Sequence, residues 1–517
     1  MPTGSFLASF AEQVRRSPDA PALLPGDPAG AAPISYRELY RLARSARARL
    51  QEQVTSAGPA VCVVAKKSPE LVALLLACFM AGHRVLLPPS DLGESTLLRL
   101  CEQAGCRYLI RVEAGLPAVH RLEPGADGPV PDVLAASPGS PAPVEFPVPS
   151  PPAGGGPGLL LTTSGSTGLP KIVPLSAGGV DRFIGWAADQ FEIGADSVVL
   201  NYAPLNFDLC LLDVWTTLAR GACVVLVGED GATDGGRLLD VVARCTVVQA
   251  VPMLFRLLSD AAAADCPGAP GLAGVRKVVF TGDAMPADLL GRVRRLFPWA
   301  ALYNLYGCTE TNDSFLYRVE AAPAPDAPVP IGRPIAGVTA VLLDGDGGVL
   351  TGPGAGELLV RTPFQAAGYL DQRLDEGRFV ATPAGLPAGR YYRTGDLVRR
   401  DATGLVTLVG RADFQVKVRG VRVNTEEVEA VISQHPEVLE VAVAAVPDRL
   451  AGHRLYAVIR RTPYAAVNSL GLRQHCAARL PRAAIPGHIE LVAEPLPRTS
   501  TGKLDRKRIR HPRLGGN

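Results

Sequence analysis

The sequence predicts an α/β protein with a large N-terminal domain and a smaller C-terminal domain. Helical patterns alternate with short apolar runs over residues 1 to about 135 and again from 159 to about 320, which is typical of α/β folds. Residues 330–410 are instead rich in strand-like runs and glycine turns, and a second α/β pattern follows them. The 517-residue chain also exceeds what one hydrophobic core usually organises. We therefore expect an N-terminal domain over residues 1–412, made of α/β subdomains plus a β-rich subdomain, and a small α/β domain over residues 413–517.

The first α/β stretch contains one clear helix and two clear strands. "YRELYRLARSARARLQEQ" (36–53) has helical spacing, whereas "AVCVVAK" (60–66) and "RVLLP" (84–88) are short apolar runs. The proline- and glycine-rich residues 137–158 predict a mobile connection. The second α/β stretch adds four strand candidates, which are "VVLNYA" (198–203), "CVVLVG" (223–228), "TVVQAVP" (246–252) and "KVVFTG" (277–282).

The β-rich subdomain and the C-terminal domain are marked by different patterns. Glycine turns are expected at "DGDGG" (344–348) and "GPGAGE" (352–357), between strand-like runs. The pattern changes after "GRADFQVKVRG" (410–420), where a compact α/β unit includes "TEEVEAVISQH" (425–435) and "LEVAVAAVPD" (439–448). This change places the domain boundary at Asp413.

Composition excludes several classes of protein. The chain is 47% apolar and 20% charged, which is typical of a folded globular protein, and its net charge of only +2 gives no basic field for nucleic acid or a membrane surface. The N-terminus becomes charged where a signal peptide would stay apolar, so a cytoplasmic protein is expected. The ten cysteines form no CxxC pairs and do not cluster with histidines, which predicts neither a zinc site nor disulfides.

A hydroxyl-rich loop lies between two apolar strand runs in "LLLTTSGSTGLPKIVPLS" (159–176). Glycines let backbone N–H groups turn inward, hydroxyls add donors and a lysine adds positive charge, so the loop can wrap a polyphosphate. The spacing is not that of a Walker A motif, which argues against a kinase or GTPase, and a solvated linker is the alternative that composition alone allows. The candidate phosphate ligands are Thr163, Ser164, Gly165, Ser166, Thr167, Gly168 and Lys171.

Four further segments follow this loop in a characteristic order. They are "NLYGCTET" (304–311), "YRTGDLV" (392–398), in which an acid is expected to end a strand, "GRADFQVKVRG" (410–420) and "PRTSTGKLDR" (497–506). With the loop, they resemble the adenylate-forming superfamily of acyl-CoA synthetases, luciferases and peptide-synthetase adenylation domains, over nearly the whole chain. Each residue alone has a structural explanation, because a Tyr is often core and a Glu or Lys often solvated. The five motifs together favour the functional interpretation.

The resemblance implies a reaction and a set of roles. Such enzymes let a carboxylate attack the α-phosphate of ATP, releasing pyrophosphate, and then pass the acyl group to a thiol, so catalysis rests on positioning and charge neutralisation. Carried over by motif, the loop residues hold pyrophosphate, and Thr309 contacts the α-phosphate beside Gly307. Glu310 holds Mg²⁺. Tyr306 stacks on adenine with Asn304 at its edge, and Asp396 binds the ribose hydroxyls with Arg411 beside it.

The same resemblance implies a mobile C-terminal domain. Lys503 would bridge the substrate carboxylate and the α-phosphate, and Asp413 would be the hinge on which the domain turns. Some positions depart from the usual pattern, because Ile172 replaces a glycine and Cys308 a proline, and "VRVNTEEVE" is looser than the peptide-synthetase form. We expect Ile172 to stiffen the end of the loop, and neither departure to remove a catalytic group.

The segment "APLNFDLCLLDVW" (203–215) corresponds to the one that opens the acyl pocket in relatives. In relatives that use amino acids, an Asp at the position of Asp208 pairs with the substrate ammonium. A helix starting there would place Asp208, Leu209 and Leu212 on one face, although such an Asp can also be a simple helix cap. Family spacing adds the remaining candidate pocket residues, which are Gln249, Val279, Thr281, Leu305, Asp313 and Ser314.

This mixed pocket argues for an amino acid of small or medium size with a hydroxyl or amine on its side chain, and against aryl and fatty acids. A β-amino acid stays open, since Asp208 can take an amine one carbon further out. The expected acceptor is the phosphopantetheine thiol of a separate carrier protein, in natural-product biosynthesis, with ATP and Mg²⁺ as cofactors and a small helper protein as a possible partner. The alternatives are transfer to free coenzyme A and, from another class, a non-catalytic nucleotide-binding regulator.

Overall fold

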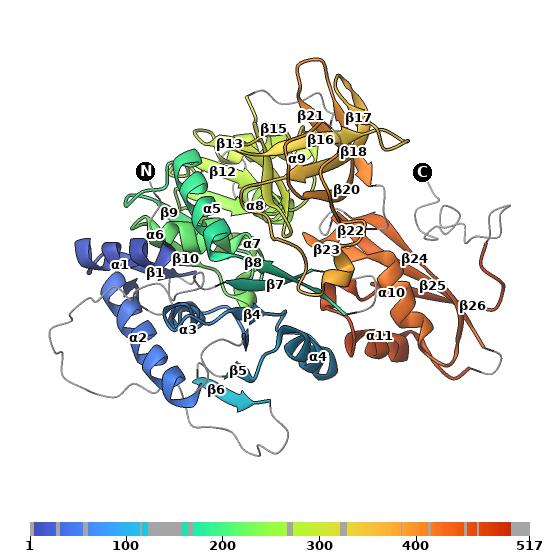
Figure 1. Ribbon diagram of the computed structural model, residues 1–517, viewed down its shortest axis with the longest axis horizontal. Helices are drawn as coiled ribbons and strands as arrows, with labels where there is room; N and C mark the ends of the chain where they lie inside the picture. The colour runs from blue at the N-terminus through green and yellow to red at the C-terminus, as the bar shows by residue number, and fades with distance from the viewer. Residues whose placement is uncertain are drawn as a thin grey trace.

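The structure is a computed structural model, which describes residues 5–26, 32–54, 60–113, 116–122, 158–163, 169–265, 272–320, 328–383, 385–411, 415–448, 452–462 and 465–497. Within these residues it has a large N-terminal unit and a small C-terminal unit, beside each other in Figure 1. The α/β class, the β-rich subdomain and the small α/β unit expected from the sequence are confirmed. Residues 412–414, where the boundary was placed, lie outside the described residues, so its position stays a prediction.

The first subdomain is built on a six-stranded sheet of order β6-β5-β3-β4-β7-β8. Its central strands β5, β3, β4 and β7 are parallel, and β6 and β8 are antiparallel edges. The helix and strands expected near its start are confirmed as α2, β3 and β4. The strands are β3 Val61–Ala65, β4 Val85–Leu87, β5 Tyr108–Glu113, β6 Leu116–Arg121, β7 Leu159–Thr163 and β8 Lys171–Leu175, with helices α1 Phe6–Arg16, α2 Tyr36–Gln53, α3 Pro69–Met80, α4 Glu94–Ala104 and α5 Ala177–Gln190.

The second subdomain is built on a nine-stranded sheet of order β15-β14-β13-β12-β11-β9-β10-β1-β2. The four strands expected from residues 198–282 are confirmed as β9, β10, β11 and β12, and they run parallel with β1 and β13. The strands are β1 Pro21–Pro25, β2 Ile34–Ser35, β9 Val198–Asn201, β10 Cys223–Leu226, β11 Val247–Ala250, β12 Lys277–Phe280, β13 Ala301–Cys308, β14 Asn312–Arg318 and β15 Arg333–Pro334, with helices α6 Thr217–Ala219, α7 Gly235–Val242, α8 Pro252–Asp265 and α9 Ala287–Leu296.

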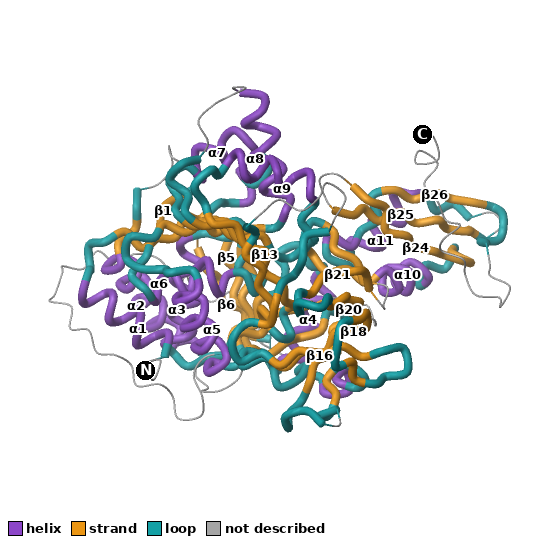
Figure 2. The backbone as a smooth tube through the Cα atoms, turned by 90° about the horizontal axis from the view of Figure 1, so that it is seen from above, coloured by secondary structure: helices purple, strands orange, loops and turns teal. Residues whose placement is uncertain are grey.

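Successive strand residues point to opposite faces, and this alternation divides the core into layers. Val199 joins the cluster that contains α1, α2, α3 and α5, whereas its neighbour Leu200 joins the cluster with α7, α8 and α9. On the other sheet, Val61 faces the same central helices, and Cys62 packs with α4. The central helices therefore lie between the two sheets, and both sheets carry helices on their outer faces (Figure 2).

The β-rich subdomain is an antiparallel sheet of order β17-β16-β18-β20-β19, with β21 paired to β20. The turn expected at residues 344–348 is present, because the Asp344 carboxylate accepts hydrogen bonds from two backbone N–H groups of that turn. Asp396 was expected at the end of a strand, but β20 continues past it to Arg400, because β21 pairs with β20 there. The strands are β16 Thr339–Leu343, β17 Val349–Leu350, β18 Gly354–Arg361, β19 Phe379–Val380, β20 Tyr391–Arg400 and β21 Val406–Arg411.

The C-terminal unit combines a two-stranded hairpin with a three-stranded sheet and two helices around one core. The helix and strand patterns expected here are α10 and β24. Gly420, at the tip of the hairpin, has φ +80°, and a Cβ there would lie 2.5 Å from Val251 of the large unit. Only glycine fits this close approach. The elements are β22 Gln415–Val418, β23 Val421–Asn424, α10 Thr425–Ser433, β24 Val438–Asp448, β25 Gly452–Arg461, α11 Ser469–Ala477 and β26 His488–Val492.

Among the helices that the structure describes, none combines the length and the apolar character needed to cross a membrane.

Candidate active site between the two units

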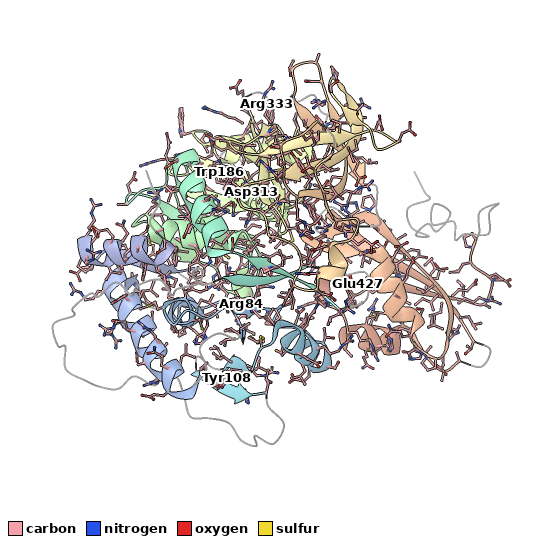
Figure 3. The ribbon with its side chains drawn as sticks, viewed as in Figure 1. Arg84, Tyr108, Trp186, Asp313, Arg333 and Glu427 are labelled. Carbon is pink, nitrogen blue, oxygen red and sulfur yellow. The ribbon has the colours of Figure 1, made fainter. Side chains whose placement is uncertain are left out.

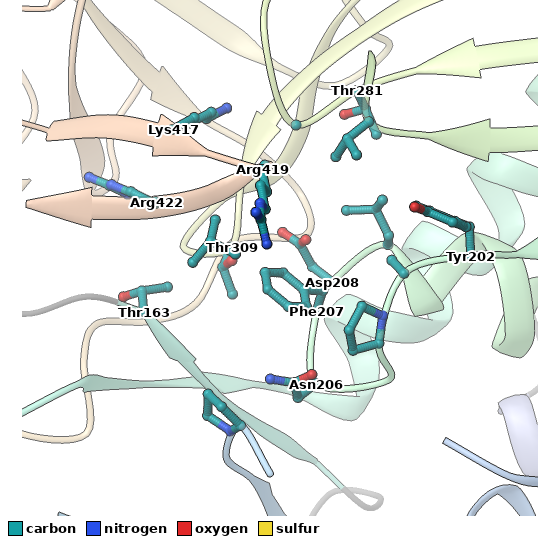
Figure 4. A pocket seen from close by; sticks show the side chains of 18 of the residues that line it. Thr163, Tyr202, Asn206, Phe207, Asp208, Thr281, Thr309, Lys417, Arg419 and Arg422 are labelled. Atoms are coloured by element: carbon teal, nitrogen blue, oxygen red, sulfur yellow. The ribbon is translucent and has the colours of Figure 1, made fainter. Parts of the chain in front are cut away.

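A cavity of about 340 Å³ lies where the two units meet. Residues that follow the carboxyl ends of β9, β10, β11 and β12 line one side of it, which is where open α/β sheets place their ligands. The other side is the β22–β23 hairpin of the C-terminal unit, which contributes Lys417, Arg419 and Arg422 (Figure 4). The cavity is thus bounded by both units, with cations on one side and the loop that carries Asp208 on the other.

Asp208 lies on the loop between β9 and a π-helical turn, Leu211–Thr216. Its carboxylate does not cap this turn, whose N-cap residue is Cys210 and which has no side-chain cap. Asp208, Leu209 and Leu212 all line the cavity, although Asp208 and Leu209 precede the π-helical turn and share no helical face with Leu212. Burial raises the pKa of Asp208, while the Thr309 hydroxyl and Lys417 oppose that shift. The helix-cap explanation of Asp208 therefore has no support in the local geometry.

Asp313 is the second carboxylate on the cavity wall. It lies on β14 opposite Gly307 of β13, where a Cβ on Gly307 would meet the backbone oxygen of Asn312 at 2.3 Å, so only glycine allows so tight a hairpin. Figure 3 places Asp313 inside the large unit. Burial and the charge of Asp208 both raise the pKa of Asp313 well above its ordinary value. Within the described part of the chain, no hydrogen bond to its side chain is formed.

A buried polar network supports the Asp208 loop from behind. Asp213 is fully buried, and its two carboxylate oxygens accept hydrogen bonds from Asn201 at 3.2 Å and from Gln249 at 2.9 Å. Lys67 donates to the backbone oxygens of Asn201, Tyr202 and Ala203 at 2.8 to 3.1 Å. Burial lowers the pKa of Lys67 to about 7, and Asp213 opposes that shift. The network fixes the start of the loop, and it turns the amide nitrogen of Gln249 toward Asp213.

The other expected acyl-pocket residues divide into two groups. Thr281 and Gln249 line the cavity. Val279, Leu305 and Ser314 are fully buried next to it, and the cavity wall as described does not include them. The Ser314 hydroxyl lies 3.3 Å from the backbone oxygen of Asn312 and 3.4 Å from the Thr311 hydroxyl. Ser314 therefore acts in this structure as a support for the β13–β14 hairpin.

The phosphate-loop candidates are only partly described. Thr163 ends β7 and lines the cavity, and its hydroxyl is buried without a hydrogen-bond partner among the described residues. Lys171 begins β8 with its ammonium 4.8 Å from the centre of the Tyr369 ring, and burial lowers its pKa while Glu310 opposes the shift. Ser164, Gly165, Ser166, Thr167 and Gly168 lie outside the described residues. Ile172, which replaces the usual glycine of the family, is fully buried within β8.

The residues expected around adenosine come together at one place. Asp396 pairs with Arg411 and accepts a hydrogen bond from the Tyr306 hydroxyl. Burial raises the pKa of Tyr306 well above its ordinary value, and the nearby Asp396 charge adds to this. Asn304 donates to the backbone oxygen of Pro330 at 2.7 Å. The acid, its arginine and the aromatic ring therefore form one cluster, although they come from distant parts of the sequence.

Glu310 lies beside this cluster and is almost fully buried. Arg422 of the C-terminal unit contacts both of its oxygens, at 3.1 and 3.2 Å, and the Tyr369 hydroxyl donates to it at 2.8 Å. Burial alone would raise the pKa of Glu310, but Arg422 and Tyr369 lower it to about 2. An ionised carboxylate suits Mg²⁺, which prefers carboxylate oxygens, and in this structure Arg422 contacts both of those oxygens. Cys308, which replaces the usual proline of the family, lies nearby and lines the cavity. Its thiol is 3.3 Å from the Thr311 hydroxyl.

Two further expected functional residues cannot be placed, in addition to residues 164–168, and several unexpected residues contribute. Asp413 and Lys503 lie outside the described residues. The cavity also takes Lys67, Arg419, Arg422 and residues of α10 such as Glu427, none of which the sequence singled out. The basic residues of the hairpin could have been predicted from the sequence. In "VKVRGVR" (416–422), Lys417 and Arg419 precede a single glycine and Arg422 follows it, which indicates a basic hairpin.

The fold and the arrangement of this site match a family of AMP-binding enzymes. Residues 10–370 match the AMP-binding enzyme family and residues 427–503 match the AMP-binding enzyme C-terminal domain, so the chain belongs to this family. The chain is 33% identical to phosphinothricin tripeptide synthetase PhsB of Streptomyces viridochromogenes, over 99% of this chain and 42% of that protein. It is 36% identical to an L-proline–[L-prolyl-carrier protein] ligase of Streptomyces coelicolor, over 68% of this chain and 65% of the ligase.

A solved structure gives the same result for the fold. An artificially fused adenylation–PCP di-domain NRPS from Klebsiella oxytoca, NpsA-ThdA, superposes with a TM-score of 0.76 and 25% identity over 94% of each chain. This chain spans less than two thirds of the synthetase and of the proline ligase. Family membership is therefore shown, and the substrate and acceptor are matters for a proposal.

Proposed function

We propose that this protein activates an amino acid by adenylation with ATP and then transfers the aminoacyl group to the phosphopantetheine thiol of a separate carrier protein. The observation that carries the proposal is Asp208, an anionic group on the cavity wall that caps no helix and faces the space where an acyl substrate would lie. An ammonium group is the natural partner of a buried carboxylate, which is costly to leave unpaired. The carrier-protein ligases among the relatives support the choice of acceptor.

The reaction has two steps. In the first, a substrate carboxylate oxygen attacks the α-phosphorus of ATP, a new P–O bond forms and pyrophosphate leaves. In the second, the thiol sulfur attacks the acyl carbon of the adenylate, AMP leaves and the thiol proton is lost to solvent or a base. The chain's own residues would orient the reactants: Asp208 holds the amine, Thr163 and Lys171 face the phosphates, and Asp396 with Arg411 holds the ribose. Glu310 would hold Mg²⁺, which supplies charge neutralisation at the phosphates.

The position of the hairpin in this structure favours the second step. Lys417, Arg419 and Arg422 line the cavity, so the C-terminal unit supplies a wall to the site. We infer that this arrangement accepts the carrier thiol, and that another orientation of the unit brings Lys503 to the substrate carboxylate. Both orientations use the same large unit, which holds the substrate and nucleotide throughout.

Two assays test the proposal. ATP–pyrophosphate exchange is measured with L-, D- and β-amino acids of small and medium size and with their des-amino analogues, and amino acids should support exchange. Aminoacyl transfer is then followed by intact-protein mass with phosphopantetheinylated carrier proteins, with the same carriers lacking phosphopantetheine as the control, and with coenzyme A. Exchange driven only by des-amino acids, or transfer to coenzyme A in preference to every carrier, would overturn the proposal.

A further inference from the structure

Asp208 and Asp313, two of the acidic residues that line the cavity, have unequal numbers of cations near them. The Thr309 hydroxyl and the charge of Lys417 both favour the ionised form of Asp208, and Arg419 extends from the hairpin into the same part of the cavity (Figure 4). Asp313 has no such partners among the described residues, and the charge that acts on it is the like charge of Asp208. The residue keeps some accessible surface on the cavity, although its carboxyl group lies deep in the protein. Asp313 therefore lacks the countercharge that Asp208 has.

The remaining cations of the cavity are already engaged. All three donors of the Lys67 ammonium are directed at backbone oxygens, which leaves it none for a carboxylate. Arg422 is held by Glu310. Lys417, Arg419 and Arg422 all belong to the hairpin of the C-terminal unit, whereas Asp313 lies on the central sheet of the large unit. Among the described residues, the part of the cavity wall at Asp313 thus has a carboxyl group without a cation of its own.

We propose that the substrate is a diamino acid, in which Asp208 binds the amine nearest the reacting carboxylate and Asp313 binds a second amine on the side chain. This inference rests on the proposed function and specifies its substrate class. A second ammonium supplies the charge that Asp313 lacks, and it separates the two carboxylates with a cation. An aliphatic side chain of equal length would offer the Asp313 carboxyl group neither a hydrogen bond nor a charge. A single amine shared by both carboxylates, or a side-chain hydroxyl on Asp313, is the competing arrangement.

Matched pairs of amino acids test this directly, because each pair differs only by a terminal ammonium in place of a methyl group. The pairs are 2,3-diaminopropionate with 2-aminobutyrate, 2,4-diaminobutyrate with norvaline, and ornithine with norleucine. For at least one pair, wild-type kcat/KM in pyrophosphate exchange should favour the diamino acid by about 30-fold or more. Serine and its longer homologues, which end in a hydroxyl, are assayed in parallel to test whether Asp313 binds a hydroxyl in place of a second amine.

The variant Asp313→Asn keeps the shape of the side chain and removes its charge. The diamino-to-aliphatic preference should then fall to near unity, whereas the matched variant Asp283→Asn, which removes a carboxylate outside the cavity lining, should retain it. Circular dichroism and ATP binding establish that each variant is folded. If the wild type activates norvaline or a hydroxy amino acid with the same efficiency as the matching diamino acid, the inference about the substrate is wrong, but the proposed function is not contradicted. Exchange that occurs only with des-amino acids would contradict both the inference and the proposed function.

Discussion

Arg422 of the C-terminal unit binds both carboxylate oxygens of Glu310 of the large unit, although the two residues are 112 positions apart in the sequence. The same carboxylate is the one that the family resemblance assigns to Mg²⁺. A guanidinium and a magnesium ion cannot occupy the same oxygens at once in this geometry. If Glu310 holds Mg²⁺ as we propose, this contact would link the position of the hairpin to the binding of the metal.

Arg422→Met should impair acyl transfer more than adenylation. The variant leaves Glu310 buried without its cation in the observed arrangement, and breaking a buried pair costs about 3–5 kcal/mol. The adenylating orientation does not require the contact, so we expect pyrophosphate exchange within a few-fold of wild type and single-turnover transfer reduced about 100-fold. Arg454→Met, which breaks an exposed pair of the same unit with Asp448, is the control and should change neither rate. Equal losses in both half-reactions for Arg422→Met would contradict the link.

Lys503→Ala should strongly reduce the rate of adenylate formation and leave ATP binding nearly unchanged. The residue lies outside the described part of the structure, so this prediction rests on the motif "PRTSTGKLDR" alone. One electrostatic group aimed at the developing charge typically contributes roughly 10² to 10³ in rate. Pyrophosphate exchange measures the loss, and Lys503→Arg, which keeps the charge, should recover part of it. Exchange within a few-fold of wild type would show that the lysine is not catalytic.

Asp413→Pro should separate the two half-reactions. Proline fixes φ near −65°, so a hinge residue that must adopt two backbone conformations can reach only one of them. We expect adenylation to survive and acyl transfer to fall. Asp413→Ala is the matched control, because it removes the side chain without restricting φ, and it should retain both steps. The hinge assignment fails if the proline variant loses both steps to the same extent.

The strands of the central sheet were predictable because they are continuously apolar and parallel, and buried parallel strands take no other pattern. Asp208, Leu209 and Leu212 were expected on one face of a helix, and they line the same cavity from a loop and a π-helical turn instead. The Asp213 network was not predictable, because its members Lys67, Asn201 and Gln249 follow no local pattern and meet only through the fold. The same holds for Arg422, whose partner lies in another unit. Asp396 was misplaced at a strand end because the pairing with β21 that extends the strand is a long-range contact.

Asp313→Asn should stabilise the substrate-free protein at neutral pH. Because the pKa of Asp313 is raised by burial and by Asp208, the folded state holds its proton over a range where the unfolded chain has lost it. Stability therefore falls as pH rises above the unfolded pKa of about 3.9, and the penalty is absent below that value. We expect Asp313→Asn to gain on the order of 1 kcal/mol at pH 7 and nothing near pH 4. Thermal unfolding from pH 4 to 8 measures this, with Asp346→Asn in an exposed turn as the control. A gain that is independent of pH would contradict it.

Asp208 should select for an acid that carries an amine, and this prediction separates amino-acid activation from general acyl activation. The Asp208 carboxylate is desolvated, and the Thr309 hydroxyl, which favours its ionised form, can satisfy only part of its accepting capacity. An acid without the amine forms no ion pair with Asp208, at a cost of roughly 2–5 kcal/mol relative to the amino acid. Wild-type exchange should therefore strongly prefer an amino acid over its des-amino analogue, and Asp208→Ala should lose that preference, mainly by losing activity with the amino acid. A wild type that uses both acids equally well would mean that Asp208 serves only to position Thr309, and the substrate class would have to be sought among acids without an amine.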